Sequence, residues 1–344
     1  MKRTQRLSIN TLRNIAIVGA FVILICRTFQ AQLIEKLKPQ HTHHKGGFAP
    51  LNNTLGFEKI AIVSTGTAWR LDGLLKAAKY THVDLEVPLQ PPWSDDEVDV
   101  FRGKGVPGRA GHIGRGQARC WLGHLNIWRE MIAQNWATVL VMEDDADWDV
   151  AVKQQLLRVS PLIRQVSGDK GQVDWSPYGK AWDLLWLGHC GDYIPESPAS
   201  LMDETLPESS LYRENDGRLT NFPSHLRMVH KSVAPICTYA YALTMPAASK
   251  LYELSRQGID RIITDYLREW CQSGTLRCLT VNPEVFHHHK QAGEVSSDIA
   301  VVEGWDDLAA KAKSDYTANI RFSARCSSNA GRPVACQNEF GGVM

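Results

Sequence analysis

The chain has 344 residues, which is enough for one large domain or two small ones with a sizeable core. Its 38 basic and 37 acidic side chains give a net charge of +1, which excludes the basic excess typical of proteins that bind nucleic acid. An apolar content of 44% indicates a folded globular protein rather than a disordered chain.

The N-terminus predicts a membrane anchor. Residues 1–13 contain four basic side chains and no acid, and twelve apolar or small residues follow over Ile15–Cys26. This run is shorter than the roughly 20 residues of an ordinary spanning helix, but its flanks extend it and no convincing cleavage site follows. We therefore predict a cytosolic tail (1–13) and an uncleaved signal-anchor (14–31), with a cleaved signal peptide as the alternative. Because the positive residues precede the span, the rest of the chain is expected in the lumen, as in a single-pass type II protein of the Golgi or ER membrane.

Residues 32–56 are polar and turn-rich without sustained periodicity, which predicts a lumenal stalk. Seven of the eight cysteines lie beyond the anchor, so at least one thiol is free or intermolecular. The pairs nearest in sequence are Cys271–Cys278 and Cys326–Cys336, and the second would close a C-terminal tail over 326–344. There is no C-x-x-C pair, which argues against a zinc module. The full connectivity is not fixed by the sequence.

Strand-like and helix-like segments alternate through the rest of the chain. Strand patterns cover 59–65, 82–89, 138–142, 182–188, 236–244 and 276–281, and helical patterns cover 70–80, 116–136, 150–166, 246–257 and 260–274. A long loop rich in Gly, Pro and charge occupies 91–116. This alternation predicts an α/β domain with an open, mainly parallel twisted sheet flanked by helices.

An acidic cluster follows the apolar strand in "VLVMEDD", which ends with Glu143, Asp144 and Asp145. Ligands of open α/β sheets bind beyond the carboxyl ends of the strands. Adjacent carboxylates repel one another unless a cation neutralises them, and hard oxygen ligands suit Mn²⁺ or Mg²⁺ with substrate phosphates completing the shell. The segment predicts a site for a divalent metal and a diphosphate. Asp147 either binds the metal or, like Asp149, caps the start of the next helix.

Several segments resemble glycosyltransferase family 25, most closely its fungal type II membrane members of the lipopolysaccharide-glycosyltransferase-like kind. The resemblance rests on "CWLGHLNIW", "NWATVLVMEDDADWDV", "WDLLWLGHCG", "CTYAYALT" and "FHHHKQAGEVSSDI", in the order found in the family. It covers about residues 57–325, and it implies one catalytic domain with a GT-A-like fold. It also implies metal-dependent, inverting transfer of a sugar, often galactose, from a nucleotide-diphosphate donor such as a UDP-hexose to a glycan or glycoprotein acceptor.

The resemblance also implies roles for individual residues. The acidic motif of the family matches Glu143, Asp144 and Asp145, and its Ser/Gly-His pair matches Gly123 and His124. A basic stretch that follows the first strand in the family is reduced here to Arg70, within "VSTGTAWRLDG". That departure keeps a second hypothesis open, namely a catalytically lapsed member that serves as a glycan-binding or scaffold protein.

Four further side chains complete the predicted site. Inversion needs a base for the acceptor hydroxyl, and Asp265 in "IITDYLREW" stands where the family shows an acid. His189 follows the strand 182–188, and His289 and Lys290 follow the last predicted strand. The predicted catalytic residues are Asp265 and Glu143, the donor-binding residues are Arg70, His124, Asp144, His189 and Lys290, and the metal ligands are Asp144, Asp145, Asp147 and His289.

Overall fold

The computed structural model describes residues 52–103, 113–171, 176–212, 222–256, 259–294 and 314–336. The predicted cytosolic tail, the signal-anchor and most of the stalk lie outside these residues. Among the helices that are described, none has the length and apolar character needed to cross a membrane. All described residues belong to one compact unit, which comprises residues 45–344.

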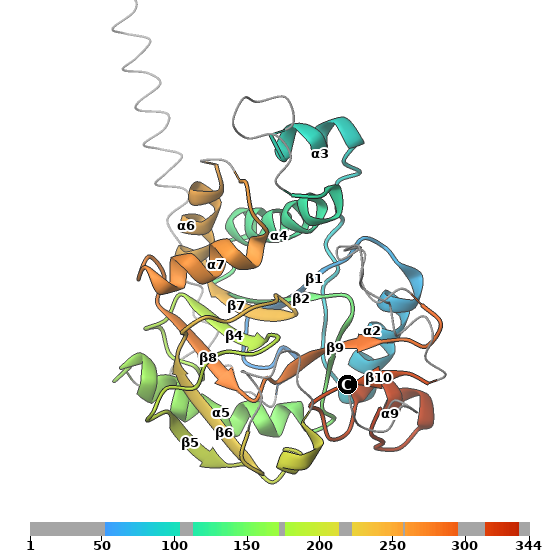
Figure 1. The fold of residues 1–344 in the computed structure, drawn as a ribbon, viewed down its shortest axis with the longest axis vertical. Coiled ribbons are helices and arrows are strands. Elements are labelled where there is room, and N and C mark those ends of the chain that lie inside the picture. Colours follow the sequence, from blue (N-terminus) through green and yellow to red (C-terminus); the bar gives the residue numbers. More distant parts are fainter. Residues whose placement is uncertain are drawn as a thin grey trace, which may run out of the picture. The chain divides into compact units, whose positions relative to one another are not determined.

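The described part of the chain is an α/β domain built on one open sheet (Figure 1). The strands are β1 (Lys59–Val63), β2 (Thr138–Glu143), β3 (Ala146–Trp148), β4 (Leu184–Gly188), β5 (Ala199–Met202), β6 (Leu226–Lys231), β7 (Ala240–Thr244), β8 (Cys278–Asn282), β9 (Phe286–Lys290) and β10 (Tyr316–Thr317). The main path runs β1-β2-β7-β4-β8-β6-β5, and β9 joins β4, β3 and β10 beside it.

The sheet is mixed in direction. β1 pairs parallel with β2, and β4 pairs parallel with β8, but β7 runs antiparallel between β2 and β4. β5 and β6 add an antiparallel edge. The expected open α/β sheet in a single domain is therefore confirmed and agrees with a GT-A-like fold, but the sheet is mixed rather than mainly parallel. The expected strand over 82–89 is reduced to an isolated bridge between Ala61 and Glu86.

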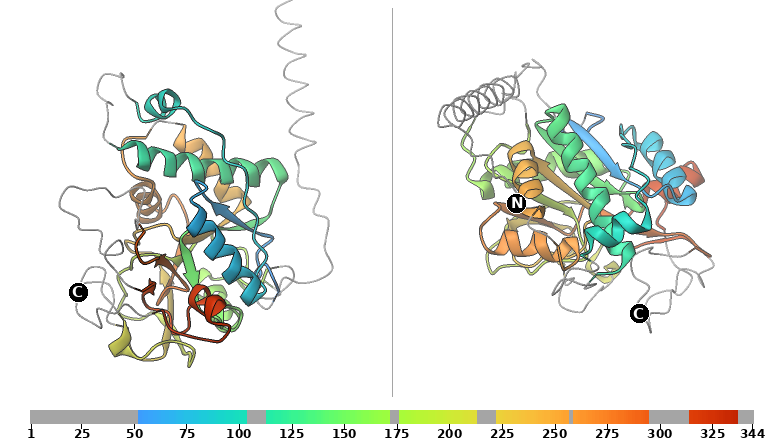
Figure 2. Two further views of the ribbon diagram at one scale, coloured as in Figure 1. Left: turned by 90° about the vertical axis from the view of Figure 1, so that its right-hand side faces the viewer. Right: turned by 90° about the horizontal axis from the view of Figure 1, so that it is seen from above.

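Helices cover both faces of the sheet (Figures 1 and 2). They are α2 (Ala68–Thr81), α3 (Asp95–Phe101), α4 (Arg115–Gln134), α5 (Val152–Ser167), α6 (Met245–Ser255), α7 (Ile263–Gln272) and α9 (Ala324–Ala330), with a 3₁₀ turn η1 (Ser209–Leu211). Alternate residues of a strand point to opposite faces. Accordingly, Ile60 and Ile62 pack with α2 and α5, whereas Ala61 packs with α4, α6 and α7.

Both ends of the described chain belong to the domain. Leu55 was assigned to the stalk, but it is only 1% exposed and lies in the same core cluster as Phe57. At the other end, α9 packs against α2, as the red and blue helices of Figure 2 show. The domain thus extends beyond the predicted limits of 57–325 at both ends.

Three disulfides join six of the seven described cysteines. Cys271–Cys278 and Cys326–Cys336 confirm the two pairs that their spacing predicted. The third bridge, Cys190–Cys237, links residues 47 apart in the sequence. Cys120 on α4 is the free thiol among the described cysteines.

Candidate functional site

The acidic cluster, Glu143, Asp144 and Asp145, lies where β2 ends and turns into β3. β2 is central, between β1 and β7, and its first five residues are buried. An apolar strand there keeps the carboxylates close to the core, so Asp144 and Asp145 are only 4% and 7% exposed. Carboxylates at such depth need positive or hydrogen-bonding partners.

Asp144 is held from the β1–α2 connection. Ser64 Oγ donates to Asp144 Oδ2 at 2.6 Å, and Arg70 Nη1 lies 3.6 Å from Asp144 Oδ1. Burial raises the pKa of Asp144 even though Ser64 and Arg70 oppose that rise. Arg70, the predicted donor-binding residue, is therefore brought to the acidic cluster by the first turn of α2.

Asp145 is the least satisfied of the three carboxylates. Arg70 Nη1 lies 3.6 Å from Asp145 Oδ2, whereas the buried Asp145 Oδ1 has no hydrogen-bond partner. Burial, reinforced by the charge of Glu143 and opposed by Arg70, raises the pKa of Asp145 to about 7. A buried carboxylate oxygen without a partner is uncommon in folded proteins and calls for a ligand or another physical explanation.

Glu143 has better partners. Thr238 Oγ1 donates to Glu143 Oε1 at 2.5 Å, and His124 Nε2 lies 3.6 Å from the same oxygen. Burial raises the pKa of Glu143, but His124, Thr238 and Arg70 together outweigh burial, so this pKa lies below its ordinary value. Glu143 is thus the carboxylate most readily ionised in the cluster.

His124 reaches Glu143 from α4 and is fully buried. Its Nδ1 lies 2.9 Å from Tyr241 Oη, which also accepts a hydrogen bond from Trp128 Nε1 at 3.0 Å. Tyr241 therefore holds the imidazole of His124 through Nδ1 and leaves Nε2 facing Glu143. His124 thus lies beside the acidic cluster, and its role in donor binding stays a prediction.

Arg325, at the start of α9, was not predicted as part of the site. Its Nε donates to the carbonyl of Ala146 at 2.8 Å, its Nη1 to the carbonyl of Arg70 at 3.0 Å, and its Nη2 to the carbonyl of Asp144. The side chain is buried, and it fixes the β2–β3 turn against α2. One guanidinium from the C-terminal segment thus orients both Arg70 and the acidic cluster.

Asp147 holds the same C-terminal segment rather than facing the acidic cluster. Oδ2 accepts from Thr317 Oγ1 at 2.7 Å and from Ser323 Oγ. Oδ1 accepts from the backbone nitrogens of Trp148 at 2.8 Å and Arg325 at 3.1 Å. Because both oxygens are occupied, this placement argues against the predicted metal role of Asp147.

Asp149 has the structural role that was expected for it. Its Oδ1 accepts from the backbone nitrogen of Ala151 at 2.8 Å, just before α5 begins, and its Oδ2 accepts from that of Phe322 at 2.8 Å. Burial raises the pKa of Asp149 to about 6, against the opposing effect of these two backbone bonds. The acidic run therefore divides into an acidic cluster with few partners and two aspartates that fix local structure.

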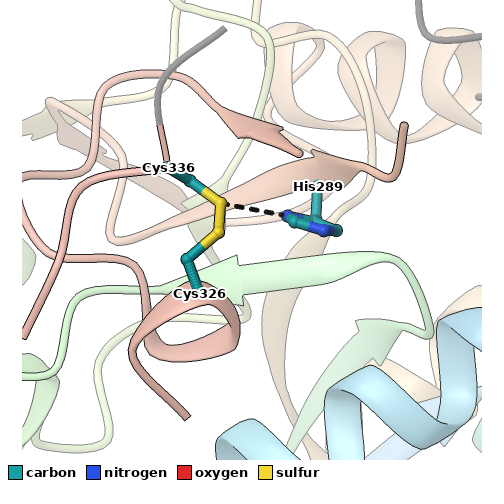
Figure 3. Close-up of side chains that lie close together, drawn as sticks. All are labelled: His289, Cys326 and Cys336. Atoms are coloured by element: carbon teal, nitrogen blue, oxygen red, sulfur yellow. Dashed lines mark hydrogen bonds between the residues drawn. A yellow bond between two sulfur atoms is a disulfide. The ribbon is translucent and has the colours of Figure 1, made fainter. Parts of the chain in front are cut away.

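The backbone of His289 contacts the acidic cluster, whereas its ring lies beside a disulfide. Its backbone nitrogen donates to the carbonyl of Asp145 at 2.7 Å, because β9 pairs with β3. Its Nδ1 lies 2.8 Å from Thr317 Oγ1 and 3.9 Å from Cys336 Sγ, and Figure 3 shows the ring beside the Cys326–Cys336 bridge. Since Thr317 donates to Asp147, it accepts from Nδ1. Burial lowers the pKa of His289 to about 4, so the ring is neutral near pH 7.

The segment that contains His289 is itself a strand. It was expected to follow the last strand, but Phe286–Lys290 forms β9. Lys290, the predicted diphosphate-binding residue, is the last residue of β9 and lies opposite Tyr316. The β3–β9 ladder therefore joins the backbone of His289 to Asp145, while Lys290 pairs with β10.

Two predicted residues lie apart from the acidic cluster. His189 is fully buried, its Nδ1 accepts from Gly191 N at 3.0 Å, and its Nε2 lies 3.0 Å from the carbonyl of Val281. Both ring nitrogens are used by the backbone, which argues against donor binding. Asp265 lies in the first turn of α7 and accepts from Arg268 at 2.8 Å. Among the described residues, no hydrogen bond or ion pair links Asp265 to the acidic cluster.

The sequence comparison finds a family that resembles the part of the chain carrying this site. Residues 104–267 match the model of glycosyltransferase family 25, described as an LPS biosynthesis protein family. Over these residues the chain is similar to glycosyltransferase family 25. The matched segment contains the acidic cluster, His124, Thr238 and Asp265.

Curated relatives of the chain include enzymes and inactive proteins of family 25. Mouse "Procollagen galactosyltransferase 2" is 22% identical over 225 residues, covering 61% of this chain and 30% of the relative. Human "Inactive glycosyltransferase 25 family member 3" is 32% identical over 91 residues, covering 26% of this chain and 13% of the relative. A "Glycosyltransferase 25 family member" of Aedes aegypti is 30% identical over 100 residues, covering 28% and 14%. The chain thus spans less than a third of the length of these relatives.

Three residues of this site were not predicted from the sequence. Thr238 and Tyr241 lie on or beside β7, whose alternating pattern gave only a strand. Arg325 lies outside the matched segment, 180 residues after Asp145, and only its place beside Cys326 marked that region. Such contacts arise from the pairing of distant elements, for which local patterns give no signal.

The acidic cluster fits a hard divalent cation. Asp144 and Asp145 offer carboxylate oxygens, which Mn²⁺ and Mg²⁺ prefer. The buried Asp145 Oδ1 has no partner, and burial together with the charge of Glu143 raises the pKa of Asp145 more than Arg70 lowers it. Donor chemistry and electrostatics therefore agree with a metal held by these two residues.

Proposed function

We propose that this protein is a metal-dependent glycosyltransferase that moves a sugar from a nucleotide-diphosphate donor to a glycan or glycoprotein acceptor. The observation that carries the proposal is the buried Asp145, whose Oδ1 has no partner, beside Asp144 at the carboxyl end of a central strand. Open α/β sheets bind their ligands at that end of the strands.

Asp144 and Asp145 are the proposed ligands of Mn²⁺ or Mg²⁺. When bound, the cation supplies positive charge for the diphosphate that leaves as the sugar is transferred. Arg70 lies 3.6 Å from both carboxylates, so it offsets only part of their charge before the donor arrives. We assign Arg70 and Lys290 to the donor diphosphate, because cations at this edge of the sheet attract it.

We propose galactose, delivered as a UDP-hexose, as the transferred sugar. The support is the likeness to mouse "Procollagen galactosyltransferase 2", which covers 61% of this chain. That relative is only 22% identical, and the basic stretch expected after β1 is reduced here to Arg70. A panel of donors is therefore needed to identify the sugar.

Inversion of the anomeric centre requires a base for the acceptor hydroxyl. We propose Asp265, whose side chain is 28% exposed on α7 and accessible to an acceptor. Glu143, the other predicted catalytic residue, has a lowered pKa, accepts a hydrogen bond from Thr238 and faces His124 Nε2 at 3.6 Å. These features suit a charged carboxylate that orients Thr238 better than they suit a base.

We also propose a lumenal location in the Golgi or ER, with attachment to the membrane through residues 14–31. Three disulfides among the described residues support an oxidising compartment. The anchor itself lies outside the described residues.

A catalytically lapsed protein that binds glycans is the second candidate function. It is favoured by the likeness to human "Inactive glycosyltransferase 25 family member 3", at 32% identity over 91 residues. The intact acidic cluster and the unsatisfied Asp145 favour the enzyme.

Turnover separates the two candidates. The purified full chain, in detergent, is incubated with a panel of UDP-sugars in Mn²⁺ or in chelator, and release of UDP is measured with and without glycan acceptors. The enzyme hypothesis expects release from one donor in Mn²⁺ and none in chelator. Glycan binding without release from any donor would support the lapsed protein.

A further inference from the structure

A second group of side chains with the chemistry of metal ligands shares Glu143 with the acidic cluster. Cys120 and His124 are four residues apart on α4, so they share one face of the helix, and Glu143 approaches them from the end of β2. One ligand atom from each of the three residues lies within 4.8 Å of the others. Cys120 is half-buried and carries the free thiol of the described cysteines.

His124 supplies an independent sign of a missing ligand. It is fully buried, and its Nε2 faces Glu143 Oε1 at 3.6 Å without a hydrogen-bond partner. A metal-bound histidine usually makes a hydrogen bond with its other ring nitrogen, which fixes the ring. Tyr241 Oη already lies 2.9 Å from Nδ1. A cation at Nε2 requires only that the imidazole proton lie on Nδ1, where Tyr241 accepts it.

The ligand types differ from those of the Asp144–Asp145 site. A thiolate, an imidazole and a carboxylate suit Zn²⁺, whereas Mn²⁺ and Mg²⁺ prefer oxygen alone. The other described group of this kind, His289 with Cys326 and Cys336, has both sulfurs in a disulfide (Figure 3), so it offers no thiolate.

We propose that Cys120, His124 and Glu143 bind Zn²⁺, with a fourth position left for water or another ligand. Atoms bound to tetrahedral zinc lie roughly 3.3–3.8 Å apart, given bond lengths of about 2.0–2.3 Å. The group therefore closes by about 1 Å through side-chain rotation. Binding releases the thiol proton of Cys120 to solvent, and Glu143 binds as the carboxylate.

Zn²⁺ at this position has a consequence for the acidic cluster. Glu143 adjoins Asp144 and Asp145 in the chain, and moving its Oε1 onto zinc pulls it away from Thr238. If the proposed sugar transfer holds, Zn²⁺ inhibits it without displacing the metal of Asp144 and Asp145. Zinc binding itself does not depend on that function.

Cobalt spectroscopy tests the site on the full chain with its disulfides intact. Co²⁺ replaces Zn²⁺ in such sites, and a thiolate ligand gives an intense charge-transfer band. We expect this band in the wild-type protein, its loss on addition of Zn²⁺, and its absence in Cys120→Ser. Asp145→Asn, which changes only the neighbouring oxygen site, should keep the band. No band in the wild type, or a band that survives in Cys120→Ser, would overturn the proposal.

A second measurement keeps the test valid if Cys120→Ser folds poorly. Alkylation of Cys120 in the wild-type protein is followed by peptide mapping, with and without Zn²⁺. We expect Zn²⁺ to slow alkylation at least tenfold, and His124→Gln, which retains the thiol, to remove that protection. Equal rates with and without Zn²⁺ in the wild type rule the site out, whatever the activity assay gives.

Discussion

Arg70 Nη1 lies 3.6 Å from Asp145 Oδ2 and equally far from Asp144 Oδ1. One guanidinium therefore faces two buried carboxylates, with Glu143 beside them. Arg325 adds a second positive charge, but its nitrogens are directed to backbone carbonyls rather than to the carboxylates. The acidic cluster is left with more negative than positive charge, which is the condition that a divalent cation corrects.

Replacing Arg70 tests this charge balance. Arg70→Met removes the partner of two buried carboxylates, so we expect the free energy of unfolding to fall by about 3 kcal/mol without metal. Saturating Mn²⁺ should restore part of the loss, because the cation takes over the compensating charge. Thermal and chemical unfolding with and without Mn²⁺ measure both effects.

The matched control is Arg277→Met. Arg277 donates to Asp183 at 2.7 Å, but its side chain is 60% exposed, so its loss should cost at most about 1 kcal/mol. Mn²⁺ should not rescue it. Equal metal rescue of both variants would show that Mn²⁺ acts elsewhere than at Arg70 and the acidic cluster.

The affinity for Mn²⁺ should depend on pH through Asp145. Its pKa is raised from 3.8 to about 7, chiefly by burial, so the folded protein binds more protons than the unfolded chain between these values. The stability lent by the protonated carboxyl is present below pH 3.8 and is lost as the pH rises toward 7. Mn²⁺ competes with this proton, so its affinity should rise about tenfold per pH unit up to pH 7 and then level.

Calorimetric titration of Mn²⁺ across this range measures the dependence directly. Metal affinity is the better readout than melting temperature, because Asp149 also has a raised pKa, of about 6, and alters stability in the same direction. A flat Mn²⁺ affinity between pH 5 and 7 would contradict the assignment of Asp145.

Arg325 should be needed for the shape of the acidic cluster. Arg325→Met leaves the carbonyls of Asp144, Ala146 and Arg70 without their buried donor, so we expect a loss of about 3 kcal/mol in the free energy of unfolding. The affinity for Mn²⁺ should fall at least tenfold. Unfolding curves and Mn²⁺ titration of the same preparation give both values.

Arg321→Met is the comparison for Arg325, since it lies in the same segment. The exposed Arg321 donates a single bond to the carbonyl of Glu204 at 2.8 Å. Its loss should cost less than about 1 kcal/mol and leave Mn²⁺ affinity unchanged. If Arg325→Met behaves like Arg321→Met, the C-terminal segment does not support the site.

Local patterns in the sequence predicted the parts of the site that are contiguous. The apolar run before Glu143 predicted strand β2. The acidic residues at its end predicted a cluster of carboxylates at the carboxyl end of that strand. The spacing of apolar residues over 116–136 predicted the helix that carries His124, and short separations predicted two of the three disulfides. In each case the signal lies within one element or between neighbouring ones.

Contacts between distant elements were not predictable in this way. The burial pattern of β7 is the same whether it runs parallel or antiparallel, so the sequence did not indicate its direction. The contact of Thr238 with Glu143 depends on that direction and was therefore not predicted. Cys190 and Cys237 are 47 residues apart in the sequence and come together only in the folded domain. His189 has the position expected of a ligand-binding residue, but the backbone of Gly191 and Val281 uses both of its nitrogens.

Asp265 is tested as the base by its effect on turnover. Asp265→Asn should lower kcat about 10²- to 10⁴-fold while leaving donor affinity unchanged, because the base acts on the acceptor. Arg268→Met removes the ion-pair partner of Asp265 but keeps the carboxylate, so its kcat should stay within about tenfold of the wild type. A kcat for Asp265→Asn within a few-fold of the wild type would place the base elsewhere.

The most direct test of the central claim is Mn²⁺-dependent binding of the donor to Asp145→Asn. Titration calorimetry with UDP-sugars compares the wild type, Asp145→Asn, and Asp183→Asn, whose carboxylate pairs with Arg277 away from the acidic cluster. We predict donor binding in Mn²⁺ for the wild type and Asp183→Asn. For Asp145→Asn, with the fold intact, we predict a loss of donor affinity of at least about 100-fold, since altering groups that only support metal ligands already costs 10- to 100-fold. Unchanged donor affinity in Asp145→Asn would contradict the metal site.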